Sequence, residues 1–295
     1  MRTAFIKQLI EEAKQNDKIF LLVGDLGYSV VEPFAELFPD RYLNVGIAEQ
    51  NMTGIAAGLA MEGYNVFTYS IGNFPTLRCI EQIRYDVCYH NLSVKVVAVG
   101  GGYAYGPLGT SHHTTEDIAM LRSIPNMTVC APADPDEAKA ATTFFSNSFS
   151  PGYLRLGKAG EPIAHESPIA DITKVLELKK GENTAIISTG GTLIQAKKHI
   201  TNNHLNWGLY SIPFIKPIDK DGILNLCNHY KTIYTIEEHQ QSGGFGSAIL
   251  ETINDLIEEG KLEYSPKIIR KAIPDIFIAY AGSQEFLKEK AGIKF

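Results

Sequence analysis

The stretch NVGIAEQNMTGIAAGLAMEG, residues 44–63, places a carboxylate, Glu49, ahead of a segment rich in Gly, Ala and Met. Its pattern predicts a helix over 49–62. Gly54 and Gly58 each weaken that helix by roughly 1 kcal/mol relative to Ala, so close packing against another surface must offset them. At a buried helix start, the helix dipole favours the Glu49 charge and desolvation disfavours it. From these residues alone, a Glu49 that caps its own helix is an equally good interpretation.

Short apolar runs alternate with helical patterns on both sides of this stretch. The expected strands cover residues 19–24, 41–46, 64–70, 94–100 and 127–132, and the expected helices cover 49–62, 76–90, 115–123 and 135–146. Continuous Val- and Ile-rich runs separated by helices are typical of a parallel sheet covered on both faces. This part of the chain is therefore predicted to form an α/β domain.

A second alternating unit follows a Gly- and Pro-rich segment without periodicity. Its expected strands cover residues 184–190, 206–212, 231–238 and 266–273, with helices over 192–202, 219–228 and 244–259. Because such a segment is typical of a connection, we expect two α/β domains, 1–157 and 175–295, joined by a linker over 158–174.

Composition excludes several classes of protein. The formal net charge of −6 argues against a nucleic-acid partner, for which a basic face is expected. No apolar run reaches the roughly 18–20 residues that a membrane-spanning helix needs. The first 18 residues read as an amphipathic helix whose acidic residues argue against a signal peptide. The four scattered cysteines are typical of reduced, buried thiols, and we expect a cytoplasmic protein.

Two glycine-rich turns each follow an expected strand and precede an expected helix. They are Gly190-Gly191-Thr192 and the run at 243–246. Backbone amides at such helix starts are able to bind an anion. Neither turn contains Gly-x-Gly-x-x-Gly or a phosphate-loop Gly-Lys-Ser/Thr, so ordinary tight turns are the favoured interpretation.

Six segments in order carry a resemblance to a known family. They are VGIAEQNMTGIAAGLA (45–60), SIGNFPTLRCIEQIRYDV (70–87), GTSHHTTEDIAMLRSIPNMTVCAPADPDEAKAA (109–141), YLRLGK (153–158), PFIKPID (213–219) and EEHQQSGGFGSA (237–248). The chain resembles the transketolase family of thiamine diphosphate enzymes across nearly its whole length. The resemblance implies two doubly wound α/β domains, a pyrimidine-binding domain followed by a transketolase C-terminal domain.

The resemblance assigns cofactor roles to residues of the first domain. Glu49 matches the family glutamate that hydrogen-bonds the pyrimidine ring nitrogen and favours the imino tautomer, which activates the thiazolium carbon as an ylide. Phe74 matches the aromatic that stacks on the aminopyrimidine, in register with Arg78, which is also expected to bind the cofactor. Tyr69 is expected to line the same pocket. The alternative for Phe74 is an ordinary core side chain.

Substrate contacts are implied for three further residues. His112 matches the family histidine that faces the reacting oxygens of the substrate, a task that suits a side chain with a pKa near neutral. His113 stands where the family usually has Gln, and either keeps a hydrogen-bonding role or changes specificity. Lys158 stands where the family often has an arginine for a substrate phosphate, which Lys holds as a point charge. A solvated lysine is the alternative.

One position departs from the pattern of sugar-phosphate transketolases. The family aspartate that reads a substrate hydroxyl falls at Leu108, in YGPLGTSHH. Leucine does not accept a hydrogen bond, and an unpaired buried hydroxyl is costly. We therefore expect transfer of a ketol or acyl unit between a ketose-type donor and an aldehyde or modified-sugar acceptor other than the usual pentose phosphates.

The family motif for the metal that anchors the diphosphate is not found. Gly24-Asp25-Leu26 followed by Asn51 is a near-match, but the third residue is not Gly and Asn51 falls inside the helix after Glu49. No metal ligand is assigned to this chain. The resemblance implies that Mg²⁺ (or Ca²⁺) and the diphosphate are bound mainly by a separate N-terminal subunit.

The expected assembly is a split enzyme in which this chain is the C-terminal subunit, because Met1 starts directly in the pyrimidine domain. The simplest form is an α2β2 heterotetramer that is active only with its partner. Three rivals remain open: the beta-type subunit of a 2-oxo acid dehydrogenase decarboxylase, a deoxyxylulose phosphate synthase-like carboligase, and a non-catalytic regulatory homologue.

Overall fold

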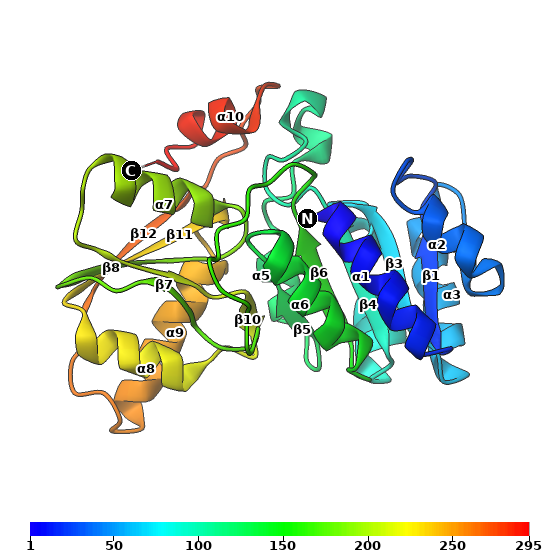
Figure 1. The fold of residues 1–295 in the computed structure, drawn as a ribbon, viewed down its shortest axis with the longest axis horizontal. Coiled ribbons are helices and arrows are strands. Elements are labelled where there is room, and N and C mark those ends of the chain that lie inside the picture. Colours follow the sequence, from blue (N-terminus) through cyan, green and yellow to red (C-terminus); the bar gives the residue numbers. More distant parts are fainter. Residues whose placement is uncertain (295) are drawn as a thin grey trace.

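A computed structural model describes residues 1–294 as two α/β domains side by side (Figure 1). The N-terminal domain contains α1 (Arg2–Gln15), β1 (Ile19–Val23), α2 (Glu32–Leu37), β2 (Tyr42–Asn44), α3 (Glu49–Met61), β3 (Asn65–Ile71), α4 (Ile80–Gln82), the π-helix η3 (Ile83–Tyr89), β4 (Val94–Val99), α5 (Asp117–Arg122), β5 (Thr128–Cys130), α6 (Pro135–Ser146) and β6 (Gly152–Leu156). Short 3-10 turns lie at Pro39–Arg41, Leu77–Cys79, Gly106–Leu108 and Thr110–His112.

The C-terminal part continues after a stretch, 157–175, without helix or strand. It contains β7 (Leu176–Lys179), β8 (Thr184–Ser188), α7 (Thr192–Asn202), β9 (Gly208–Ser211), β10 (Phe214–Lys216), α8 (Lys220–His229), β11 (Thr232–Gln240), α9 (Phe245–Glu258), β12 (Lys267–Ile273) and α10 (Gln284–Lys290). Two α/β domains were predicted, and the structure confirms this fold class.

The first sheet has seven strands in the order β10-β5-β6-β4-β3-β1-β2. Its core strands are buried on both faces, as the apolar runs predicted; every residue of β4 is buried. Helices α1 and α6 cover one face through Phe5 and Phe145, and α3 covers the other through Met52 and Ala56. The carboxyl ends of the parallel strands therefore meet at one edge, where Glu49 begins α3.

The sheets are mixed and not purely parallel. β10 pairs antiparallel with β5, so the first sheet takes an edge strand from beyond the linker. The second sheet has the order β12-β11-β8-β9-β7, and its edge strand β7 is antiparallel to β9. Helix α7 packs on one face of this sheet and α8 and α9 pack on the other.

Two expectations from composition can be compared with the structure directly. All four cysteines are buried and free, as expected. Within residues 1–294, none of the helices combines the length and the apolar character that a membrane span requires.

Candidate active site

Glu49 is a buried carboxylate at the carboxyl edge of the first sheet. The residue is 2 % exposed. The Ser70 hydroxyl donates to its Oε1 at 3.3 Å, and Arg78 Nη1 donates to its Oε2 at 3.2 Å. A Cβ at Gly24, just after β1, would lie 3.3 Å from the Ser70 hydroxyl, so glycine there spares the Glu49 partner a tight contact. Ala48 is the N-cap of α3 and no side chain makes a cap hydrogen bond there, so Glu49 does not cap its own helix.

Three further side chains extend from Glu49 as one contiguous cluster. The Arg78 guanidinium carbon lies 5.1 Å from the centre of the Phe74 ring. The Phe74 ring meets the His112 ring edge-on, with centroids 5.2 Å apart and an interplanar angle of 73°. A buried acid, an aromatic ring and an imidazole are therefore linked by successive contacts through Arg78, although the chain separates Glu49 from His112 by more than sixty positions.

Hydrogen bonds hold the loop that carries His112 against the segment just after β3. The Asn73 side-chain amide donates to the backbone oxygens of Ser111 and His113. At Gly72, any side chain would collide with the Thr114 hydroxyl, because a Cβ would lie 1.8 Å from it. Glycine at position 72 lets the loop approach β3 closely, and this approach brings His112 to Phe74.

His113, the next residue of the same loop, is buried against Tyr103. It is 4 % exposed, and its ring meets that of Tyr103 edge-on at 5.0 Å. Burial lowers the pKa of His113, so the ring is neutral near pH 7. Leu108, in contrast, is 55 % exposed in the turn before His112. The structure therefore buries His113 and leaves Leu108 on the surface of the loop.

Two of the expected site residues lie elsewhere. Tyr69 points to the opposite face of β3 from Ser70 and stacks on Phe5, with ring centroids 5.9 Å apart. The expectation that Tyr69 lines the Glu49 pocket therefore does not fit the alternation of side chains along the strand. Lys158 is exposed and lines a cavity of about 250 Å³ between the domains, together with Gly190, and that cavity does not include Glu49.

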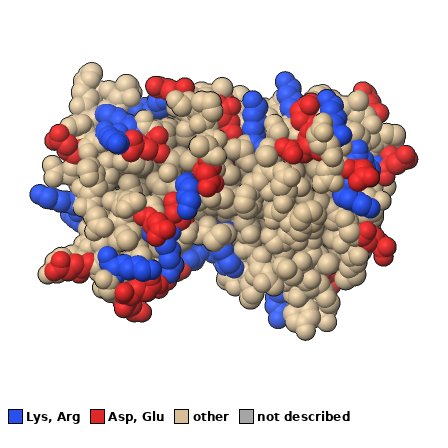
Figure 2. All heavy atoms as spheres, turned by 60° about the horizontal axis from the view of Figure 1, so that its bottom comes forward, with Lys and Arg blue, Asp and Glu red and all other residues tan. Residues whose placement is uncertain are grey.

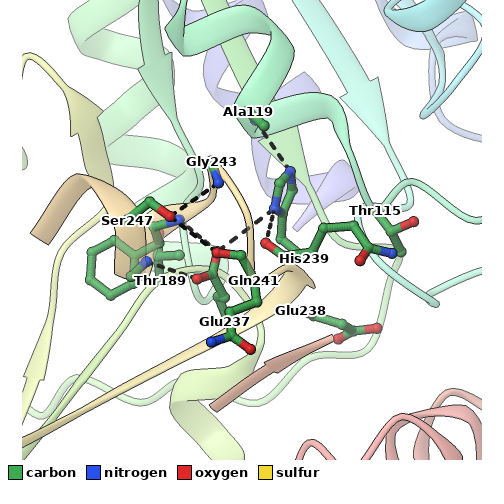
Figure 3. A network of polar contacts seen from close by, with 12 residues as sticks. Thr115, Ala119, Thr189, Glu237, Glu238, His239, Gln241, Gly243 and Ser247 are labelled. Carbon is green, nitrogen blue, oxygen red and sulfur yellow. Dashed lines mark hydrogen bonds and ion pairs between the residues drawn. The ribbon is translucent and has the colours of Figure 1, made fainter. Parts of the chain in front are cut away.

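The C-terminal domain contacts the chain on both sides of the His112 loop, and Figure 3 shows one of these contacts, in which His239 points to Ala119. Glu238 Oε1 accepts the Tyr103 backbone N–H at 2.5 Å, and the Gln240 N–H donates to the Thr115 oxygen at 2.8 Å. His239 Nε2 accepts the Ala119 N–H at the start of α5 at 3.2 Å. These contacts were not predicted, because the block 237–248 carried only the resemblance to the family.

A fully buried ion pair joins the same region to the first sheet. Arg155 Nε and Nη2 donate to the two oxygens of Asp117 at 2.7 and 3.2 Å, and Tyr153 also donates to Asp117. Arg155 Nη2 donates further to the Thr114 and Glu238 backbone oxygens. Asp117 is 0 % exposed, so these bonds compensate the cost of burying its charge.

The two glycine-rich turns differ in what their amides contact. At the second turn, Glu237 accepts the N–H groups of Phe245 and Gly246 at 2.6 and 2.7 Å, so this chain's own carboxylate occupies the start of α9. Burial raises the pKa of Glu237 to about 7, although both backbone bonds oppose this shift. The second turn is therefore a tight strand–helix turn and not an open anion site, which is the interpretation that the sequence favoured. Gly190 adopts a φ of 62° and lines the interdomain cavity.

The two polar residues of the near-match to a metal motif, Asp25 and Asn51, lie in separate surroundings. Asp25 accepts the Asn44 side-chain amide at 2.9 Å, and Asn51 lies exposed on α3. Among residues 1–294, no three His, Cys, Asp or Glu side chains gather closely enough to hold a metal ion.

Two family models match the chain in the order of its two sheets. The model described as transketolase, pyrimidine binding domain, matches residues 1–159, and the model described as transketolase, C-terminal domain, matches residues 173–293. The chain belongs to the transketolase family. The family is one of thiamine diphosphate-dependent transferases, and the expected resemblance is confirmed.

Relatives of this transketolase-family chain include separate subunits and longer proteins. It is 31 % identical to one of the subunits of apulose-4-phosphate transketolase from Actinobacillus succinogenes, covering 98 % of this chain and 92 % of that one. It is 35 % identical to the 1-deoxy-D-xylulose-5-phosphate synthase of Caldanaerobacter subterraneus, of which it spans only 46 %. A solved split-gene transketolase, described as an inactive β4 tetramer, superposes with a TM-score of 0.85 at 31 % identity, covering 99 % of this chain and 93 % of the other.

Proposed function

We propose that this chain supplies the pyrimidine side of a shared transketolase active site. In the complete enzyme, a two-carbon ketol or acyl unit passes from a ketose-type donor to an aldehyde or sugar acceptor. The observation that carries the proposal is the contiguous cluster of Glu49, Phe74 and His112 at the edge of the first sheet.

The residues present fit the pyrimidine half of thiamine diphosphate. Glu49 offers a buried oxygen, Oε2, whose one bond in the described residues is to the half-exposed Arg78. Phe74 offers a ring beside it, and His112 lies at the other edge of that ring. When bound, the cofactor supplies the nucleophilic carbon. Glu49 would hold a proton at the pyrimidine nitrogen, Phe74 would orient the ring, and His112 would exchange protons with substrate oxygens.

A partner subunit would complete the site. The matched domains are the pyrimidine-binding and C-terminal ones, so we assign the diphosphate and its Mg²⁺ (or Ca²⁺) to an N-terminal transketolase-like subunit. This division is supported by the split-gene transketolase and by the Actinobacillus succinogenes relative, which is itself named as one subunit among others. We propose the α2β2 form for the active assembly.

The surface of the N-terminal domain supports an interface there. Gly54 and Gly58 lie exposed on α3, and a Cβ at either would meet nothing within 4 Å. Met61, Tyr85 and Tyr89 are exposed on α3 and the following helical segment. On the side that Figure 2 brings forward, which is the bottom of the view in Figure 1, the N-terminal domain also carries a wide area with few charged side chains. These observations fit the close packing that the weak helix formers of α3 require.

The isolated chain is expected to bind thiamine diphosphate weakly or not at all. Because only the pyrimidine contacts lie on this chain, affinity should appear when the diphosphate-binding subunit is added. Titration calorimetry with thiamine diphosphate and Mg²⁺, on the chain alone and on the co-purified pair, measures this. Tight, Mg²⁺-dependent binding by the chain alone would contradict the shared site.

We expect the substrate to differ from the usual pentose phosphates because Leu108 replaces the hydroxyl-reading aspartate. The relative named for apulose 4-phosphate supports a modified sugar phosphate as the substrate class. In the assembled enzyme, Leu108→Asp should raise kcat/KM for xylulose 5-phosphate with ribose 5-phosphate about tenfold, the size of one regained hydrogen bond. Leu108→Ala, whose side chain accepts no hydrogen bond, is the control and should give no such increase. Ordinary transketolase efficiency in the wild-type enzyme would refute this expectation.

A second candidate is a deoxyxylulose phosphate synthase-like carboligation, favoured by the 35 % identity to that synthase. It differs in its donor, which would be pyruvate with loss of carbon dioxide. Carbon dioxide release from pyruvate in the presence of glyceraldehyde 3-phosphate, at a rate above that of ketose cleavage, would favour it.

A further inference from the structure

Arg78 touches both side chains that the proposed function assigns to the pyrimidine ring. Its Nη1 donates to Glu49 Oε2 at 3.2 Å, and its guanidinium carbon lies 5.1 Å from the centre of the Phe74 ring. A guanidinium is planar, carries N–H donors and stacks on aromatic faces. One planar group therefore makes a hydrogen bond to the acid and a ring contact with the aromatic at once.

These are the two contacts that an aminopyrimidine would make with Glu49 and Phe74. We propose that Arg78 is a stand-in that fills the pyrimidine subsite in the free chain and leaves it when the cofactor binds. This inference rests on the proposed function. It gives Arg78 a defined part in cofactor binding, since the cofactor must displace this side chain before Glu49 and Phe74 become available.

Burial explains why the free chain needs such a group. The Glu49 side chain is 1 % exposed, and without Arg78 its carboxylate would keep, among residues 1–294, only the Ser70 hydroxyl as a hydrogen-bond partner. An ionised carboxylate buried with so little compensation is strongly disfavoured. In the free chain, the Arg78 cation compensates the Glu49 charge. When the cofactor binds, its pyrimidine ring would share a proton with Glu49 and replace Arg78 in this role.

The attachment of Arg78 lets its side chain leave without disturbing the loop. The side chain is 51 % exposed, and solvent lies open to the guanidinium. Its backbone is held independently: the Gln50 side-chain amide donates to the Arg78 oxygen at 3.2 Å, and the Arg78 N–H donates to the Asn73 oxygen at 3.4 Å. Rotation of the long side chain is therefore sufficient.

Displacement lowers the apparent affinity for the cofactor, because only the fraction of molecules with Arg78 swung out is competent to bind. Removing the guanidinium should therefore tighten cofactor binding and lower the stability of the free chain. A residue that served as a direct cofactor ligand would give the opposite effect on binding. The two roles are separable by measuring both quantities.

The first test uses the free chain alone. Arg78→Met, which keeps the stem and removes the cation, should lower the Tm by about 3–6 °C because Glu49 loses its partner. The loss should shrink in Glu49→Gln/Arg78→Met, where no carboxylate is left uncompensated. Arg84→Met, which removes a cation from an exposed pair with Glu81, is the matched control and should shift the Tm by less than about 1 °C. An Arg78→Met chain as stable as the wild type would overturn the inference.

The second test titrates the co-purified two-subunit enzyme with thiamine diphosphate and Mg²⁺ in a calorimeter. Arg78→Met should lower the Kd about threefold to tenfold, and Arg84→Met should leave it unchanged. If Arg78→Met does not fold, Arg78→Lys, which keeps the charge and loses the planar fork, should lower the Kd about threefold. Equal or weaker binding by the variant overturns the inference. No binding by the wild-type pair would instead overturn the proposed function.

Discussion

Glu49→Gln is expected to lower kcat of the assembled enzyme by about 10²–10⁴-fold, the usual range for loss of a positioned proton-transfer group. Glutamine has the shape of glutamate and accepts a hydrogen bond at one oxygen. It does not share a proton with a ring nitrogen as a carboxylate does. The effect should therefore fall mainly on kcat, measured by steady-state turnover with the natural donor and acceptor at saturating cofactor.

Glu62→Gln is the matched control, because Glu62 is an exposed carboxylate just after the other end of α3. It should retain wild-type turnover. Full activity of Glu49→Gln with the partner would contradict the assignment, and would mean that Glu49 only stabilises the start of α3. The Kd for cofactor, measured in parallel, separates a lost proton-transfer role from simple loss of binding.

The second large effect is expected on stability, at the buried pair of Arg155 and Asp117. Arg155→Met should reduce the free energy of unfolding by about 3–5 kcal/mol, because it leaves the Asp117 charge buried with little compensation. Three bonds to backbone or carboxylate from Arg155 Nη2 are lost at the same time. Urea denaturation of the free chain, followed by circular dichroism, measures the change.

An exposed ion pair in the same domain provides the comparison. Arg84 and Glu81 are 63 % and 67 % exposed, so breaking their pair should cost no more than about 1 kcal/mol. The double variant Asp117→Asn/Arg155→Met should recover part of the loss, since no uncompensated charge stays buried. Equal, small effects at both pairs would show that water reaches Asp117 in the folded chain.

Much of the fold was predictable from the sequence, because buried parallel strands appear as continuous Val- and Ile-rich runs. The expected helix over 49–62 corresponds to α3 (Glu49–Met61), and the expected strand over 94–100 corresponds to β4. The short strands β7 and β10 were not predicted. Three or four residues carry too little periodicity to distinguish an edge strand from a connection.

The candidate site was predictable in part. Glu49, Phe74 and His112 were named from sequence motifs, and the structure brings them together, although their roles remain proposals. Tyr69 was assigned to the same pocket because it lies close to Phe74 along the chain. It lies one position before Ser70, and adjacent residues of a strand point to opposite faces.

The contacts behind the His112 loop could not be predicted from sequence. Glu238, His239 and Gln240 lie over 100 residues from the loop that they hold. Only the packing of the two domains brings them there. Their charge and hydrogen-bonding capacity are visible in the sequence, but their partners are backbone N–H and C=O groups, which every residue carries.

The pairing of β10 with β5 makes the N-terminal domain depend on residues from beyond the connection. The Phe214–Lys216 segment closes the edge of the first sheet, and the Ala131 N–H donates to the Pro213 oxygen beside it at 2.8 Å. An N-terminal domain without the residues that follow 158–174 would leave β5 as an open edge, able to pair with another molecule. The two domains match separate family models, yet β10 from beyond the connection is an edge strand of the first sheet. We therefore expect that the N-terminal domain does not fold as an independent unit without β10.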